Sequence, residues 1–193
     1  VQQGSKLPSW LPRQEKGVRS SCALPYELYV DGALSSDKKS FTIFFESRRD
    51  LFGERAAGAP FLAYANGKDR NALRNWSYAV RAGDRITDEW TVKDFEDGLY
   101  HLKVYGPNGF FRAFAGNENG PAIDVHIGYE HTNTASKKAT GNLVIDVKNL
   151  SRDKDYTIEI TDKSYGKAPK TLVLTKTKAS STLVITWTIW RRI

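Results

Sequence analysis

The amino-acid sequence predicts an all-β protein, and three observations support this. Short stretches of alternating apolar and polar residues are rich in β-branched and aromatic side chains, clusters of Gly, Asp, Asn and Ser separate them, and almost no stretch has a 3.6-residue apolar repeat. Seven such stretches lie between residues 26 and 115. Seven short strands with frequent turns are typical of a two-sheet sandwich of the immunoglobulin-like kind. A closed barrel is the alternative.

The strands of this first sandwich are expected at 26–30, 40–46, 61–65, 75–81, 85–91, 98–105 and 110–115. Side chains alternate across a strand, so each set of apolar residues marks one face. The predicted core residues are Phe41, Ile43 and Phe45, then Trp76, Tyr78 and Val80, and then Tyr100, Leu102 and Val104. The stretch 48–57 is the only helix-like one, and we expect a loop there with at most a turn or two of helix.

The rest of the chain repeats this pattern, with five strands expected at 123–129, 142–148, 156–161, 170–177 and 182–190. In the first copy YELYVDG leads through a Ser/Lys turn to SFTIFFES, and in the second IDVHIGY leads through a Ser/Lys turn to GNLVIDVKN. By this match TWTIW corresponds to RITDEW, so we expect the second sandwich to be short by two strands. The predicted organisation is a linker or strap at 1–21, a first module at 22–118 and a second, truncated module at 119–193.

Length and composition fit one large or two small domains. The 193 residues are 40% hydrophobic, which is enough to bury a core. No stretch approaches the roughly 18 consecutive apolar residues that a membrane-spanning helix needs. The chain has no methionine, even at position 1, so we expect it to be a processed product or a piece of a longer protein. The single Cys22 excludes a disulfide within the chain.

The net charge of +7 is spread unevenly. Residues 1–21 carry four basic and one acidic side chain, residues 22–118 carry 13 and 14, and residues 119–193 carry 12 and 7. The basic residues occur singly or in pairs, and no RNA-recognition or zinc-finger motif is present. We therefore expect a solvated basic surface and no nucleic-acid partner.

The sequence carries no recognisable catalytic or metal-binding motif. His101, His126 and His131 stand outside HxH, HExxH and CxxC patterns, so we expect surface or partly buried imidazoles. There is no GxSxG motif and no phosphate-binding glycine loop. The acidic residues clustered in 84–97 favour a solvated edge over a catalytic pair. We predict no catalytic residue, no metal ligand and no cofactor.

One turn carries the candidate contact residues. The run 106–109, GPNG, lies between two expected strands and predicts a hairpin turn in which Pro107 presets φ and Asn108 or Gly109 takes a positive φ. The adjacent rings of Phe110 and Phe111 must point to opposite faces of a strand, so one of them is expected to be exposed or covered by a neighbouring loop. Together with Arg112, these residues form a candidate contact for a lipid surface or a partner domain. The candidate residues are Asn108, Phe110, Phe111 and Arg112.

Several motifs resemble a known family. LPRQEKGVRSSCALPYELYV, GAPFLAY, WSYAVRAGDRITDEW and GLYHLKVYGPNGFFRAF are similar to the C-terminal region of bacterial phosphocholine-specific phospholipases C. The most specific parts are the PxQExGxR…ALPYEL entry and the GPNGFxRxF exit, and the likeness covers residues 8–116. In that family two repeated β-sandwich modules follow an N-terminal catalytic domain, which holds the nucleophile and the metal ligands. The resemblance therefore implies no catalytic residue in this chain.

The leading functional hypothesis is that this chain is a non-catalytic accessory region of such a phospholipase C, secreted or periplasmic. The resemblance implies a parent enzyme that cleaves phosphatidylcholine-type lipids to phosphocholine and diacylglycerol. The sandwiches are expected to pack on its catalytic domain and to help it address a membrane lipid surface, with the basic second module biased toward anionic head groups. The alternative is a carbohydrate- or protein-binding β-sandwich of a surface protein.

Overall fold

The computed structural model describes residues 24–66, 73–134 and 137–186. The fold is all-β, as predicted, and each of the twelve expected strands overlaps an observed one. The strands are β1 (Leu28–Leu34), β2 (Ser40–Ser47), β3 (Ala59–Asn66), β4 (Leu73–Val80), β5 (Arg85–Thr91), β6 (Tyr100–Tyr105), β7 (Phe111–Gly116), β8 (Ile123–His131), β9 (Ala139–Asn149), β10 (Tyr156–Ile160), β11 (Lys170–Leu174) and β12 (Ser180–Ile185). Four single-turn 3-10 helices join some of them: η1 (Gly53–Arg55), η2 (Val92–Asp94), η3 (Glu96–Gly98) and η4 (Pro107–Gly109).

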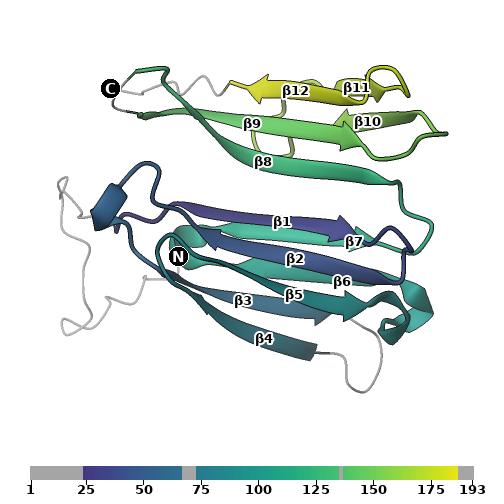
Figure 1. Cartoon of the computed structure of the whole chain (residues 1–193), viewed down its shortest axis with the longest axis horizontal. Helices are drawn as coiled ribbons and strands as arrows, with labels where there is room; N and C mark the ends of the chain where they lie inside the picture. The colour runs from purple at the N-terminus through teal and green to yellow at the C-terminus, as the bar shows by residue number, and fades with distance from the viewer. Residues whose placement is uncertain (1–23, 67–72, 135–136, 187–193) are drawn as a thin grey trace, which may run out of the picture.

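The first sandwich consists of β1 to β7. Its two antiparallel sheets have the strand orders β1-β2-β5 and β4-β3-β6-β7 (Figure 1). The fourth strand pairs with the third and not with the fifth, so this sandwich differs from a constant-type immunoglobulin domain, in which the fourth strand joins the sheet of the fifth. The expected helix-like stretch is a loop with the single turn η1, as predicted.

The core of the first sandwich is aromatic. The predicted sets from β2 and β6 are buried, and the ring of Phe45 packs against Phe61 of the opposite sheet with 5.6 Å between centroids. Trp76 and Tyr78 of β4 point to the same face as predicted but are only partly buried. The reason is that β4 is an edge strand with a neighbour on one side only.

The second sandwich repeats the pairings of the first. Its sheets have the orders β12-β9-β8 and β10-β11, which correspond to β5-β2-β1 and β3-β4. Its core is much smaller and centres on Ile145, Val147 and Leu174. Among the described residues, no strand corresponds to β6 or β7.

The expected last strand needs a correction. The strand that pairs with β9 as β5 pairs with β2 is residues 180–185, ahead of the TWTIW segment that the sequence match had selected. Both segments alternate with a period of two, so the pattern alone did not distinguish them. Residues 187–190 of the expected strand lie outside the described residues.

The two sandwiches lie against each other through β1 and β8. Figure 1 shows β8 running beside β1 and the three-stranded sheet of the second sandwich lying over the first sandwich. Leu28 and Val30 of β1 point into the first core, whereas Tyr29 between them points to the outer face of the sheet. Tyr29 is nevertheless only 3% exposed, because side chains of β8 and of the loop after β2 cover it. The junction is therefore a packed contact.

Candidate ligand-binding cleft between the sandwiches

A cleft of about 540 Å³ opens where the two sandwiches meet. The first sandwich contributes residues from the start of β1, from the loop before η1, from η4 and from the start of β7, and the second contributes residues of β8 and β9. Five aromatic side chains line it: Tyr26, Phe52, Phe110, Phe111 and Tyr129. The four candidate residues named from the sequence, Asn108, Phe110, Phe111 and Arg112, all lie in its wall.

The turn at η4 has the predicted conformation. A positive φ was expected at Asn108 or Gly109, and both take one, 57° at Asn108 and 77° at Gly109. The amide of Gly106 donates a hydrogen bond of 2.9 Å to the carbonyl oxygen of Phe110, which closes the hairpin. The turn thus places the beginning of β7 at the cleft.

The two phenylalanines after the turn diverge. Phe110 packs edge-on against the buried Phe61, with 6.0 Å between ring centroids. Phe111 points outward, remains 44% exposed and contacts only the outward-facing Tyr105 among the described aromatic rings. Phe110 therefore packs against the core, whereas Phe111 is exposed to solvent.

Arg112 lies in the wall of the cleft and is partly buried. Its guanidinium lies 4.7 Å from the centre of the Phe110 ring, and Nη1 donates to the carbonyl oxygen of Phe111 at 3.0 Å. Its Nε is buried and has no hydrogen-bond partner among the described residues. Burial lowers the pKa of Arg112, since a charged form that is partly out of water is disfavoured. Tyr129 and Asp31 oppose this lowering of the pKa.

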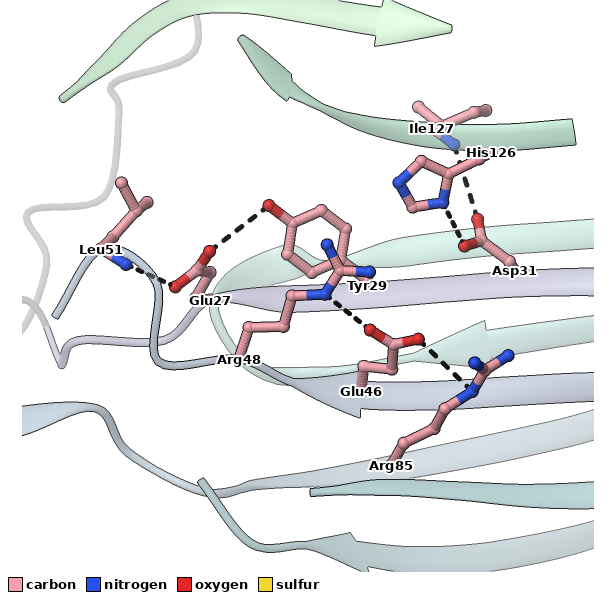
Figure 2. A network of polar contacts seen from close by, with 9 residues as sticks. All are labelled: Glu27, Tyr29, Asp31, Glu46, Arg48, Leu51, Arg85, His126 and Ile127. Atoms are coloured by element: carbon pink, nitrogen blue, oxygen red, sulfur yellow. Dashed lines mark hydrogen bonds and ion pairs between the residues drawn. The ribbon is translucent and has the colours of Figure 1, made fainter. Parts of the chain in front are cut away.

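Glu27 places a carboxylate in the wall of the same cleft. The side chain is 1% exposed, and its oxygens accept hydrogen bonds from the Leu51 amide at 2.9 Å and from the Tyr29 hydroxyl at 3.4 Å (Figure 2). A carboxylate has about four acceptor sites, so Glu27 can accept further hydrogen bonds. Burial and the Glu27 charge together raise the pKa of Tyr29 to about 12.

Arg48, which lies over the Tyr29 ring, forms its ion pair with Glu46 and not with Glu27. Arg48 lies 4.0 Å from the centre of the Tyr29 ring, and its Nε forms a 2.6 Å ion pair with Glu46. Arg85 binds the other oxygen of Glu46 at 3.4 Å, as Figure 2 shows. Among the described residues, Glu27 forms no ion pair. The carboxylate is therefore buried without a cation in that part of the chain.

A polar contact between Asp31 and His126 joins the two sandwiches. Nδ1 of His126 in β8 lies 2.5 Å from Oδ2 of Asp31 in β1, and the other carboxylate oxygen accepts from the Ile127 amide at 3.5 Å (Figure 2). The imidazole also stacks on Tyr29 with 5.9 Å between centroids. The sequence predicted a surface or partly buried imidazole, and His126 is partly buried.

Raising the pH is expected to weaken this contact. The hydrogen bond to Asp31 raises the folded-state pKa of His126, against a smaller lowering by burial, with Arg48 lowering it and Asp146 raising it further. A raised pKa means that the stabilisation is complete below the ordinary value of about 6.5 and is lost as the pH rises through the folded-state pKa. The difference in unfolding free energy between wild type and His126→Gln should therefore shrink over that range, measured by denaturant unfolding at several pH values.

Asp31→Asn serves as the control for this titration. The asparagine retains the shape of the side chain but cannot carry the charge that favours the imidazolium. The pKa of His126, followed by NMR, is expected to fall in this variant. If it stays where it is in wild type, Asp31 does not cause the shift.

The comparisons with known proteins match this architecture. A model of the bacterial phospholipase C, C-terminal domain, matches residues 20–117, which contain all seven strands of the first sandwich. The match spans more than half of the 193 residues, and the chain belongs to this family. The resemblance seen in the sequence motifs is thus confirmed. No solved structure matches the chain significantly.

The similar curated proteins are bacterial phospholipases C. A non-hemolytic phospholipase C of Burkholderia pseudomallei is 38% identical over 108 residues, which are 55% of this chain and 14% of that protein. A non-hemolytic phospholipase C of Pseudomonas aeruginosa is 34% identical over 127 residues, 62% of this chain and 17% of that protein. A hemolytic phospholipase C of the same organism is 28% identical over 159 residues, which are 75% of this chain and 21% of that protein. The chain therefore spans only a small part of these relatives and corresponds to their C-terminal domain.

Two further observations concern chemistry and membranes. Within the described residues, no group of three or more His, Cys, Asp or Glu side chains is arranged to hold a metal ion. No helix in the same part of the chain is long and apolar enough to span a bilayer.

Proposed function

We propose that this chain is a non-catalytic accessory region of a phospholipase C, and that its parent enzyme cleaves phosphatidylcholine-type lipids to phosphocholine and diacylglycerol. The observation that carries the proposal is the match of residues 20–117 to the C-terminal domain of this family. The chain packs on an N-terminal catalytic domain in the secreted or periplasmic enzyme. The small share of each relative that it covers supports a region that works together with a larger one.

The proposed organisation has three parts. Residues 1–21 link the sandwiches to the catalytic domain, residues 22–118 form the first module, and residues 119–193 form the second. The two separate hydrophobic clusters support this division, since each lies within one sandwich. The basic balance of residues 119–193 biases the second module toward anionic head groups.

The turn η4 and the start of β7 form the proposed lipid contact. Phe111 and Asn108 are both exposed and line the same cleft. The next residue of β7 is the positively charged Arg112. An aromatic ring with polar neighbours suits the interface between lipid head groups and acyl chains. The lipid surface would meet the end of the first sandwich at which the cleft opens.

The Phe111→Asp substitution tests this contact. Burying a phenylalanine side chain is worth roughly 1.5–3 kcal/mol, so its loss should weaken vesicle binding about tenfold or more. The measurement is sedimentation of the full chain with phosphatidylcholine vesicles and with anionic vesicles at low salt. Leu99→Asp is the matched control, because Leu99 is also exposed but precedes β6 at the end of that strand opposite Tyr105.

Wild-type chain that stays in the supernatant with both vesicle types would overturn the lipid contact. Equal binding by the two aspartate variants would place the contact somewhere other than Phe111. Binding to a glycan array without binding to vesicles would favour the alternative of a carbohydrate-binding sandwich.

A further inference from the structure

The outer face of the sheet β4-β3-β6-β7 is poor in charge. Alternation turns Phe61 of β3 and Leu102 of β6 toward the core, so their neighbours in the two strands face outward. The outward positions with described side chains are Pro60, Leu62 and Tyr64 of β3, Asn75, Ser77 and Ala79 of β4, His101, Lys103 and Tyr105 of β6, and Phe111, Ala113 and Ala115 of β7. Among them, Lys103 alone carries a full charge at neutral pH, and none is acidic.

The outer face of the other sheet of this sandwich is charged. Its strands β1, β2 and β5 turn Asp31, Glu46, Arg85 and Glu89 outward. Arg85 pairs with Glu46 at 3.4 Å across two of these strands. The solvated face of an antiparallel sheet normally carries polar side chains of this kind. The uncharged face of β4-β3-β6-β7 therefore differs from an ordinary solvated face.

An apolar row crosses the uncharged face. Leu62 lies opposite Tyr105 in the strand register, and Tyr105 lies opposite Phe111. Leu62 is 40% exposed, and Tyr105 and Phe111 are each 44% exposed. The centroid of the Tyr105 ring lies 5.0 Å from that of Phe111 and 5.7 Å from that of Tyr64, so the rings form one continuous surface. An exposed surface that is rich in aromatic rings and depleted in charge is typical of a protein–protein interface.

Lys103 indicates what kind of surface covers this face. It lies opposite Tyr64 on one side and Ala113 on the other, next to the apolar row. Among the described residues, it forms no ion pair. A second copy docked face to face by a two-fold axis would add another lysine to the interface and no acid. A matching partner is therefore a different surface, apolar and with an acidic side chain opposite Lys103.

We propose that this face, centred on Leu62, Tyr64, Lys103 and Tyr105, is the surface that docks on the catalytic domain of the parent enzyme. The inference rests on the proposed function, which supplies that domain. The face belongs to the first sandwich, which is the part of the chain that the family model matches. The matched residues make up only 14% to 21% of the relatives, so most of each relative lies outside them. Phe111 ends the row at the edge strand β7, so the docked domain lies beside the proposed lipid contact.

Photo-cross-linking of the full-length parent enzyme tests the docking face. With p-benzoylphenylalanine in place of Tyr105, irradiation is expected to link position 105 to a peptide of the catalytic domain, identified by mass spectrometry. The same group in place of Leu99 is the control, because Leu99 is also exposed but precedes β6 at the end of that strand opposite Tyr105. Cross-links from position 105 to residues 1–21, to a second copy or to added phosphatidylcholine vesicles would overturn the proposal, as would the absence of any cross-link.

Two charge variants locate the interface. Leu62→Glu places a charge in the apolar row, and Lys103→Glu reverses the one cation of the face, so each is expected to lower the yield of the cross-link about tenfold or more. Thr87→Glu is the matched control for the first, since Thr87 is exposed on the outer face of the other sheet. Lys93→Glu, in η2 and off the sheets, is the control for the second. Thermal melting of the isolated chain checks that each variant is folded, and equal yields in all four variants would overturn the proposal.

The activity of the parent enzyme separates this inference from the proposed function. Hydrolysis of phosphatidylcholine by an enzyme that gives no cross-link from position 105 would sink the docking face and leave the proposed function standing. A cross-link to an N-terminal domain that does not hydrolyse phosphatidylcholine would do the reverse.

Discussion

Leu102→Asp is expected to abolish the cooperative melting of the first sandwich. Leu102 lies in β6 between β3 and β7, is 0% exposed and belongs to the main core. The substitution removes apolar contacts and buries a carboxylate with no partner, a combination that costs about 4 kcal/mol or more. Small domains are stable by only about 5–15 kcal/mol, so most of the stability is lost. Near-ultraviolet circular dichroism during heating follows the aromatic core directly.

Leu99→Asp is the matched control for this experiment. Leu99 lies three positions before Leu102 in the chain but is 53% exposed, so the new carboxylate stays in water. Surface substitutions of this kind usually change stability by no more than about 0.5 kcal/mol. A Leu102→Asp variant that melts as wild type does would refute the assignment of the β6 core face.

The core was predictable because alternation within one strand is a local signal. The faces of β2 and β6 were predicted residue by residue, since their neighbours on both sides complete the burial. The end of β1 was missed: Asp31 and Gly32 resemble turn residues but pair with Phe44 and Ile43 of β2. A Cβ at Gly32 would lie 2.5 Å from the Phe41 ring, so a glycine in this strand makes room for a core side chain.

Only the part of the cleft that depends on local sequence was predictable. Asn108, Phe110, Phe111 and Arg112 come from one turn, whose chemistry is local. Tyr129 and Ala139 enter the site only because the second sandwich lies over β1, and no periodic pattern carries that information. The pair of His126 and Asp31 is separated by 95 residues, so sequence spacing could not bring it together.

Tyr29→Ala is expected to uncouple the two sandwiches. The Tyr29 ring lies outside both hydrophobic clusters, and His126, Tyr129 and Arg48 pack around it. Removing a large buried aromatic side chain costs about 3–5 kcal/mol. Most of that cost should fall on the junction, because the inward-facing neighbours Leu28 and Val30 stay in place. The second sandwich should then move away from β1 while the first still melts cooperatively.

Small-angle X-ray scattering and limited proteolysis measure this uncoupling. The radius of gyration is expected to rise, and residues 117–122 between β7 and β8 are expected to become the first cleavage site. Tyr29→Phe is the control: it retains the ring and loses only the 3.4 Å hydrogen bond to Glu27, a cost of about 1 kcal/mol. If Tyr29→Ala leaves both the radius and the cleavage pattern of wild type, the ring does not hold the sandwiches together. The junction would then depend on the Asp31–His126 contact instead.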